Sequence, residues 1–339
     1  MKQTIDEFLR QWNDTSLTVP LHTSGSTGTP KQFLAEKSKM LASARITCDF
    51  LQLKPGDKAL LCLPIDYIAG KMMVVRSIER QLHLAEVEPS NHPLAEIDEN
   101  FDLVAMVPSQ VYTSLQDPIE CKRLKRIRHL IIGGGAISRE LETTLRSFPN
   151  AIWSTYGMTE TLSHIALRRI NGDQASEWYT PFDGVDLSLE DMDNNNPFVG
   201  RLVINAPHVC EKKLVTNDIV EFHKQLTFPQ QFRVIGRTDN VICSGGIKLH
   251  IEQLEEALRP FLHVPFCITK RPDKQYGEVA ILLLGTDEVS SGDVLEVCRR
   301  KLTPYAVPKA VYTTQAGIPL TPNGKIDRRK ALEIIRHLP

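Results

Sequence analysis

The stretch that decides the fold of this chain is Thr23-Ser24-Gly25-Ser26-Thr27-Gly28-Thr29-Pro30-Lys31. Its glycines let the backbone turn sharply and bring N–H groups towards an anion, its hydroxyls add donors, and Lys31 adds a mobile positive charge. We expect such a loop to hold a polyphosphate. Its spacing differs from G-x-x-x-x-G-K-[ST], which argues against an ordinary P-loop NTPase. Taken alone, the loop is explained more simply as a flexible connection.

The bulk properties favour a soluble protein of about two domains. A length of 339 residues predicts about two domains with real cores. The 40 basic and 41 acidic residues give a formal net charge of −1, so neither nucleic acid nor an anionic membrane is an expected partner. The sequence leaves the oligomeric state open.

Cysteine usage and the N-terminus both indicate the cytoplasm. The seven cysteines are scattered, and none forms C-x-x-C, which favours free thiols in a reducing compartment and argues against a structural zinc site. Asp6 and Glu7 interrupt any signal peptide, whereas Ile5, Phe8 and Trp12 are spaced as in a helix. No apolar run approaches the length of a membrane span.

From residue 38 to residue 157, helical and extended patterns alternate. We expect helices over 40–51 and 68–81, and short buried strands over 58–63, 103–108, 129–132 and 151–154. Alternation of this kind predicts a mostly parallel sheet covered by helices. Ligands bind beyond the carboxyl ends of such strands, where residues 133–136 and 155–160 follow two of them.

The later part of the chain changes character twice. A β-rich section is expected over 185–235, and a compact α+β pattern begins after Gly236. We predict a helix over 251–262, strands near 267–270 and 278–284, a helix over 292–302, a strand over 309–314 and a last helix from Asp327. The predicted domains are therefore 1–236 and 241–339, joined by a hinge at 237–240.

Three further motifs follow the opening loop in order. They are Ser154-Thr155-Tyr156-Gly157-Met158-Thr159-Glu160-Thr161, Gly236-Arg237-Thr238-Asp239-Asn240 and Pro319-Leu320-Thr321-Pro322-Asn323-Gly324-Lys325. Together with the loop, this ordered set resembles the AMP-forming adenylate family of acyl-CoA synthetases, peptide-synthetase adenylation domains and firefly luciferase. The resemblance extends from about Leu21 to Arg328. It implies a large N-terminal α/β domain and a small, mobile C-terminal α+β domain.

The resemblance also implies roles for individual residues. The loop would hold the β- and γ-phosphates of ATP, Thr159 would bind the α-phosphate, and Glu160 would bind Mg²⁺. The implied adenine and ribose contacts are Gly134, Gly135, Ala136, Tyr156, Gly157, Asp218 and Arg237. Lys325 would be the catalytic lysine of adenylation, Asp239 the hinge, and Ser244, Gly245 and Gly246 the lining of a tunnel for coenzyme A. For Tyr156 the alternative is a core aromatic, for Asp218 a turn residue, and for Lys325 a surface lysine.

The chain departs from the family pattern at two places. Only 22 residues precede the loop, where relatives carry a long segment, so we expect an N-terminal domain trimmed at its start. Tyr67 stands where relatives often have a histidine that rearranges between the two half-reactions. A tyrosine keeps the ring and a polar tip but carries no charge at neutral pH.

Within the family, the segment from Tyr67 to Arg76 most resembles the o-succinylbenzoate–CoA ligases of menaquinone biosynthesis. Their substrate carries a second carboxylate that must be neutralised in the pocket. Lys71 and Arg76 are the cations available for it, and the alternative is two solvated helix charges. Three other functions stay open: a ligase for another small aromatic or short-chain acid, an enzyme that loads a carrier-protein thiol, and a non-catalytic nucleotide-binding protein.

Overall fold

The computed structural model of the chain describes residues 3–22, 32–193, 196–224, 229–321 and 325–338. Contacts divide the chain into two compact units, which we describe separately. The first unit comprises Met1–Ser188, Val203–Val215 and Phe222–Arg233. The second comprises Leu189–Leu202, Thr216–Glu221 and Val234–Pro339.

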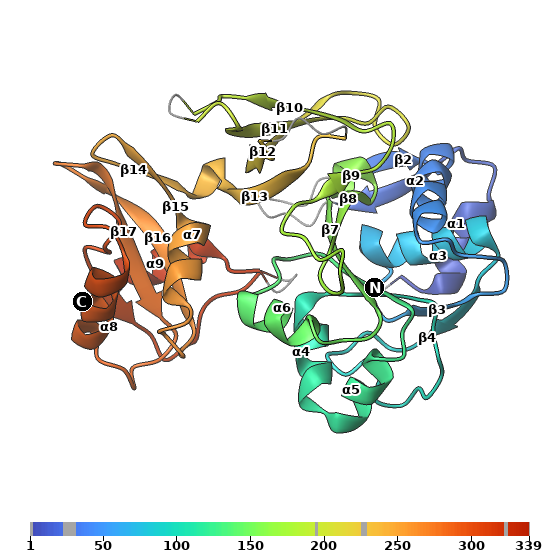
Figure 1. Cartoon of the computed structure of the whole chain (residues 1–339), viewed down its shortest axis with the longest axis horizontal. Helices are drawn as coiled ribbons and strands as arrows, with labels where there is room; N and C mark the ends of the chain where they lie inside the picture. The colour runs from blue at the N-terminus through green and yellow to red at the C-terminus, as the bar shows by residue number, and fades with distance from the viewer. Residues whose placement is uncertain (1–2, 23–31, 194–195, 225–228, 322–324, 339) are drawn as a thin grey trace. The chain divides into compact units, whose positions relative to one another are not determined.

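A seven-stranded sheet forms the centre of the first unit (Figure 1). Its order is β4-β3-β5-β6-β7-β8-β9; the pairs from β4 to β7 are parallel, and β8 and β9 are antiparallel. The strands are β3 (Lys58–Leu61), β4 (His83–Glu86), β5 (Leu103–Met106), β6 (His129–Ile132), β7 (Ala151–Gly157), β8 (His164–Arg169) and β9 (Thr180–Pro181). All four residues of β5 are buried, which explains why the central strands have continuous apolar sequences.

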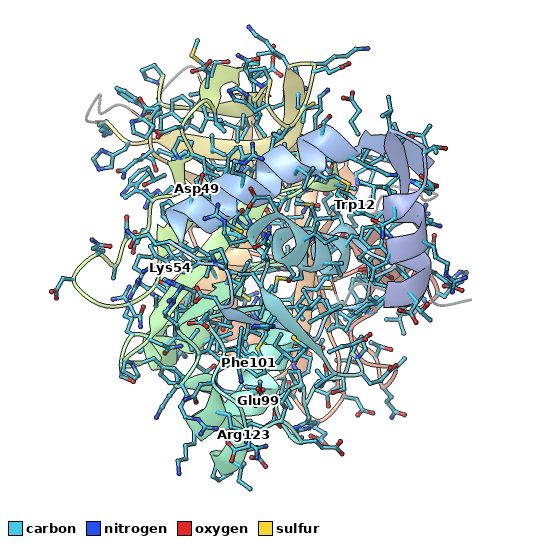
Figure 2. The ribbon with its side chains drawn as sticks, turned by 90° about the vertical axis from the view of Figure 1, so that its right-hand side faces the viewer. Trp12, Asp49, Lys54, Glu99, Phe101 and Arg123 are labelled. Carbon is cyan, nitrogen blue, oxygen red and sulfur yellow. The ribbon has the colours of Figure 1, made fainter. Side chains whose placement is uncertain are left out.

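The helices of this unit begin at capping side chains in several cases. Thr4 and Glu7 form a capping box at α1, Asp117 caps α5, and Ser138 caps α6. The helices are α1 (Ile5–Asn13), α2 (Lys37–Phe50), α3 (Ile68–Arg80), α4 (Pro108–Gln116), α5 (Pro118–Leu124) and α6 (Arg139–Leu145). Figure 2 shows this unit with Trp12 on α1 and Asp49 near the end of α2.

Two short strands flank the opening loop. β1 (Thr18–His22) and β2 (Gln32–Glu36) pair antiparallel with His22 opposite Gln32. This pairing brings together the two chain positions that border the loop. The loop itself, Thr23–Lys31, lies outside the described residues.

A four-stranded sheet has the order β10-β11-β12-β13. Its strands are β10 (Asp186–Glu190), β11 (Val199–Asn205), β12 (Leu214–Phe222) and β13 (Phe232–Arg237). The division between the two units passes through these strands.

The rest of the second unit is a sheet with helices on both faces. Its strands are β14 (Val241–Ser244), β15 (Ile247–His250), β16 (Phe266–Asp273), β17 (Gly277–Leu284) and β18 (Val311–Thr313), in the order β15-β14-β17-β16 with β18 parallel to β17. Alternate residues of β17 enter different cores: Leu282 packs with α7 (Ile251–Leu258) and α8 (Ser291–Lys301), and Ile281 packs with α9 (Arg328–Arg336).

The predicted fold class is confirmed: the first unit is α/β with a mostly parallel sheet, and an α+β region follows. One expectation about the site was wrong. Thr155 and Tyr156 lie inside β7 rather than beyond it, because β7 continues to Gly157 by pairing with β8. The domain boundary at 237–240 stays a prediction. Among the described residues, no helix combines the length and apolarity needed to cross a membrane.

Candidate active site

The glycines after β6 follow the carboxyl end of a parallel strand, as predicted. A Cβ on Gly133 would stand 2.4 Å from Thr155 Oγ1 in β7, so a side chain here would force the Thr155 hydroxyl to move. Gly134 has a φ of +79°, in the left-handed region that favours glycine. Gly135 and Ala136 are exposed, which leaves their backbone accessible to a ligand.

The turn after β7 presents the predicted acidic residue to solvent. Glu160 is exposed on the 3₁₀ turn Thr159–Thr161. Thr161 is fully buried and fixes this turn: its Oγ1 accepts from the Met158 N–H at 3.0 Å and donates to the Ser163 carbonyl at 2.7 Å. The short turn therefore exposes one carboxylate while a buried hydroxyl satisfies its backbone.

Tyr156 lies in an aromatic cluster. Its side chain is 8% exposed, and its ring meets Phe232 edge-on at 5.0 Å between centroids, with Tyr179 at 6.0 Å. This environment favours the core-aromatic interpretation, and the stacking of Tyr156 on adenine stays a prediction. Beside it, a Cβ on Gly157 would stand 2.3 Å from the Ser163 carbonyl, so glycine allows β7 to approach the segment that precedes β8.

Helix α3 and the residue before it supply the three residues predicted for the acyl pocket. Tyr67 precedes its first turn and is 37% exposed. A Cβ on Gly70 would stand 2.4 Å from the Pro64 carbonyl, so the helix can start this close to the preceding segment only with glycine there. Lys71 and Arg76 are each 2% exposed, which excludes two solvated helix charges.

The two cations of α3 meet different partners. Lys71 Nζ donates to Gln3 Oε1 and lies over the Phe8 ring of α1, 5.1 Å from its centroid. Burial lowers the pKa of Lys71 to about 8, and the nearby Asp66 opposes that shift. The structure thus associates Lys71 with the N-terminal segment, not with the turn that Arg76 contacts.

Arg76 is a buried cation beside the turn that follows Glu160. Its Nη2 donates to Ser163 Oγ at 2.6 Å, and its Nη1 has Met73 Sδ at 3.7 Å. Its Nε is buried and has no hydrogen-bond partner among the described residues. Burial lowers the pKa of Arg76 to about 10, at which the side chain is still charged at neutral pH.

The sequence reasoning missed the polar side chains around Arg76. Ser163 Oγ lies 3.3 Å from His164 Nδ1, and His164 Nε2 lies 3.0 Å from Thr47 Oγ1 in α2. Ser163 and His164 follow the predicted motif 154–161 after one residue, Leu162, and a polar pair at the start of the apolar strand β8 was the only signal available. Thr47 offered none, since it looks like any polar residue in an amphipathic helix.

In the second unit, three predicted residues form a charged group. Arg237 Nη1 donates to Asp218 Oδ1 at 2.8 Å, and its Nη2 lies 3.3 Å from Asp239 Oδ2. Asn217 Nδ2 donates to the same Asp239 oxygen at 3.3 Å. Asp218 thus pairs with Arg237, and the guanidinium links the end of β13 to β12 and to the predicted hinge.

Lys325 belongs to the same charged group. The Thr321 N–H donates to the Lys325 carbonyl at 2.7 Å, and the Lys325 N–H donates to Thr321 Oγ1 at 3.2 Å. The Lys325 residue is exposed, yet the protein atoms around its amine partly desolvate that amine, and this desolvation lowers the pKa of Lys325. The Arg237 charge lowers it further, and Asp218 raises it. The fold thus brings together residues far apart in sequence.

The predicted tunnel glycines form the tip of a hairpin. Gly245 and Gly246 join β14 to β15 with φ values of +59° and +85°, the pattern of a two-residue hairpin turn. Two tyrosines that the sequence reasoning missed border this tip. A Cβ on Gly245 would lie 3.4 Å from the Tyr276 ring and 3.8 Å from the Tyr305 ring. Lys309 Nζ lies over the Tyr276 ring, 4.7 Å from its centroid.

Comparison with known proteins gives a family match over most of the first unit. The sequence model of the AMP-binding enzyme family matches residues 7–212. A 2-succinylbenzoate–CoA ligase from Enterococcus faecalis is 24% identical, over 96% of this chain and 71% of that protein. One from Bacillus cytotoxicus is also 24% identical, over 93% of this chain and 69% of that protein.

Solved structures give the same picture. An AMP-forming acyl-CoA synthetase/AMP-acid ligase II-like protein from Dyadobacter fermentans is 32% identical with a TM-score of 0.63, over 97% of this chain and 93% of that one. An o-succinylbenzoate coenzyme A synthetase from Bacillus subtilis, solved with ATP and magnesium, has a TM-score of 0.75 at 20% identity, over 92% of this chain and 69% of that one. At that identity the likeness concerns the fold alone.

Proposed function

Because this chain belongs to the AMP-binding enzyme family, we propose that it activates a carboxylic acid with ATP and transfers the acyl group to coenzyme A. The acid we propose is o-succinylbenzoate, which would place the enzyme in menaquinone biosynthesis. In the first step a carboxylate oxygen attacks the α-phosphorus and pyrophosphate leaves. In the second step the thiol attacks the acyl carbon and AMP leaves.

The observation that carries the proposal is the group formed by Asp218, Arg237 and Lys325. A carboxylate can accept from both ribose hydroxyls, and two cations can neutralise a phosphate and an incoming carboxylate. Desolvation and, after it, the positive charge of Arg237 lower the pKa of Lys325, which is consistent with two cations that lie near each other. A nucleotide-binding relic has no need for the lysine, so its position favours chemistry over binding alone.

The first unit supplies the other parts of the proposed nucleotide site. The exposed backbone at 134–136 suits the adenine, and Thr159 suits the α-phosphate. Glu160 fits Mg²⁺, since it is a hard oxygen ligand that is exposed on a turn fixed by a buried hydroxyl. When bound, the ion neutralises phosphate charge; Glu160 holds it, and the chain's own residues orient the nucleotide.

The hairpin tip suits the thiol substrate. Glycines without side chains at 245 and 246 allow a thin pantetheine arm to pass close to the backbone. The rings of Tyr276 and Tyr305 and the charge of Lys309 offer stacking and phosphate contacts of the kind a nucleotide end group uses. This combination favours coenzyme A over a carrier-protein thiol.

Arg76 supports a dicarboxylic substrate. A buried guanidinium that has no ion-pair partner among the described residues is costly unless an anion joins it. The second carboxylate of o-succinylbenzoate is such an anion. We base this part on Arg76 alone, since Lys71 already contacts Gln3 and Phe8.

The first experiment measures pyrophosphate exchange on a panel of acids, followed by dependence on coenzyme A. We expect o-succinylbenzoate to be used best and coenzyme A to be required for product release. Preference for a plain benzoate or a fatty acid would reassign the substrate, acyl transfer to a carrier protein alone would reassign the acceptor, and binding of ATP without exchange on any acid would favour a non-catalytic protein.

The second experiment tests the acid site with Arg76→Ala. Loss of one partner of a buried charge pair costs on the order of 2–5 kcal/mol, so the KM for o-succinylbenzoate should rise at least about 30-fold. The KM for ATP should not change. Arg76→Lys supplies a second variant that keeps the charge, and Arg80→Ala is the matched control on α3, since its partners are Asp49 and Glu79. Unchanged o-succinylbenzoate kinetics in Arg76→Ala would remove the carboxylate site.

A further inference from the structure

A chain of polar side chains connects Arg76 to the interior of α2. Arg76 Nη2 meets Ser163 Oγ at 2.6 Å, Ser163 Oγ meets His164 Nδ1 at 3.3 Å, and His164 Nε2 meets Thr47 Oγ1 at 3.0 Å. Thr47 Oγ1 in turn reaches the Ser43 carbonyl at 3.2 Å. Thr47, His164 and Arg76 are buried and Ser163 is half-buried, and of the four side chains Arg76 is the one that keeps an unpartnered donor, its Nε, among the described residues.

The contact of Thr47 with the Ser43 carbonyl favours one direction for the hydrogen bonds of this network. Thr47 has a single hydroxyl proton, which it donates to the Ser43 carbonyl, so it must accept from His164 Nε2–H. We therefore assign the proton of the neutral imidazole to Nε2. His164 Nδ1 then accepts a hydrogen bond from the Ser163 hydroxyl. The Ser163 oxygen in turn accepts a hydrogen bond from Arg76 Nη2.

The electrostatic surroundings agree with this assignment. Burial lowers the pKa of His164 well below its ordinary value, and the charge of Arg76 lowers it further. A charged imidazole would carry a proton on Nδ1, and Ser163 would then have to accept from both His164 and Arg76. The neutral ring with Nδ1 as acceptor is the form that leaves the Ser163 oxygen facing the guanidinium.

We propose that His164 is a positioning residue that, through Ser163, orients the Arg76 guanidinium towards the second carboxylate of the acid substrate. This inference rests on the proposed role of Arg76. Ser163 engages only Nη2, while Nε has no partner among the described residues and Nη1 has only a weak thioether contact. The guanidinium is thus held at one corner and keeps donors for a carboxylate, which accepts best when two parallel N–H groups face it.

The test compares variants of His164 on two acids, o-succinylbenzoate and an analogue that lacks the ring carboxylate. His164→Phe keeps a ring but removes both hydrogen bonds, and we expect the KM for o-succinylbenzoate to rise about tenfold, the scale of one hydrogen bond to a charged group. His164→Asn keeps an acceptor near the Nδ1 position and should restore most of this loss. The KM for the analogue should change less than about twofold in either variant.

A double-variant cycle separates positioning from stability. In an Arg76→Ala background, His164→Phe should add no further rise in the KM for o-succinylbenzoate, because the residue acts through Arg76. An equal rise for both acids, or a full further rise in the Arg76→Ala background, would overturn the positioning role. If His164→Phe does not fold, Thr47→Val removes the Nε2 partner more gently and should show the same selectivity for the dicarboxylic acid; equal effects on both acids would again overturn the inference.

The two proposals fail in different ways. If Arg76→Ala leaves o-succinylbenzoate kinetics unchanged, the proposed carboxylate site itself is wrong. If Arg76→Ala raises the KM but His164→Phe and Thr47→Val do not, only the positioning role of His164 is wrong.

Discussion

Lys71 and Arg76 are buried to the same extent on one helix, yet their chemistry differs. A guanidinium keeps its proton when buried because its ordinary pKa is so high, whereas an ammonium loses it readily. The pKa of Lys71 accordingly falls to about 8, and that of Arg76 only to about 10. We therefore expect Arg76 to offer a permanent charge, and Lys71 to carry a cost in stability that depends on pH.

The first prediction at this scale is that Lys71→Met stabilises the protein at pH 7. Below pH 8 the folded and the unfolded chain both carry the lysine proton, so the wild type pays the full cost of a buried charge. Between pH 8 and about 10.5 the folded chain loses this proton before the unfolded chain does, and the cost disappears. The free energy of unfolding of Lys71→Met should exceed that of the wild type by on the order of 3 kcal/mol at pH 7, and this difference should vanish towards pH 10.5.

Urea unfolding at pH 7, 8, 9 and 10 measures this difference. Lys54→Met, at an exposed lysine, is the matched control and should show no such trend. A gap between Lys71→Met and the wild type that is as large at pH 10 as at pH 7 would mean that the buried ammonium does not titrate in this range.

The second prediction concerns Lys325. Lys325→Ala should slow adenylation roughly 10²–10³-fold, the loss expected for one preorganised electrostatic contact. Thioester formation from pre-made acyl-adenylate should stay largely intact, because the lysine is proposed to serve only the first half-reaction. Single-turnover assays of each half-reaction measure the two rates, and Lys330→Ala is the control at an exposed lysine. Equal losses in both half-reactions would contradict this division of roles.

At the scale of elements, buried apolar strands were the most predictable part. The strand at His129–Ile132 was predicted to the residue, and α3 to within one residue, because a parallel strand and an amphipathic helix depend on short-range patterns. β1 was missed because Pro20 interrupts its pattern; proline is tolerated there since β1 belongs to a two-stranded sheet and has a free edge.

In the candidate site too, residues that belong to a local motif could be predicted, and contacts between distant parts of the sequence could not. Contiguous motifs led to the prediction of Glu160, Asp218, Arg237 and Lys325, and their roles stay predictions. The contact between Thr47 and His164 joins residues 117 positions apart and has no local signature. The burial of Arg76 could not be predicted from the sequence either. A cation on a helix usually faces water, and it is the packing of α3 that buries this one.

At the scale of the whole molecule, the chain carries its proposed chemistry in two units. The phosphate loop, Glu160 and Arg76 belong to the first unit, and Asp218, Arg237 and Lys325 belong to the second. The proposed reaction uses both sets, and the family resemblance implies a hinge that moves between the two half-reactions. The short 3₁₀ turn Thr238–Asn240 after β13 is the segment where we expect the backbone to change.

The last prediction tests this hinge with Asp239→Pro. Proline fixes φ near −65° and removes a backbone N–H, so it restricts the pivot between the two half-reactions. The substitution also removes the Asp239 carboxylate, which contacts Arg237 and Asn217. Asp239→Ala removes the same carboxylate without restricting the backbone. We expect thioester formation to fall much further in Asp239→Pro than in Asp239→Ala, while pyrophosphate release is similar in both. Because both variants lose the carboxylate and only proline restricts the backbone and removes its N–H, equal rates of thioester formation would mean that the pivot lies elsewhere in the chain.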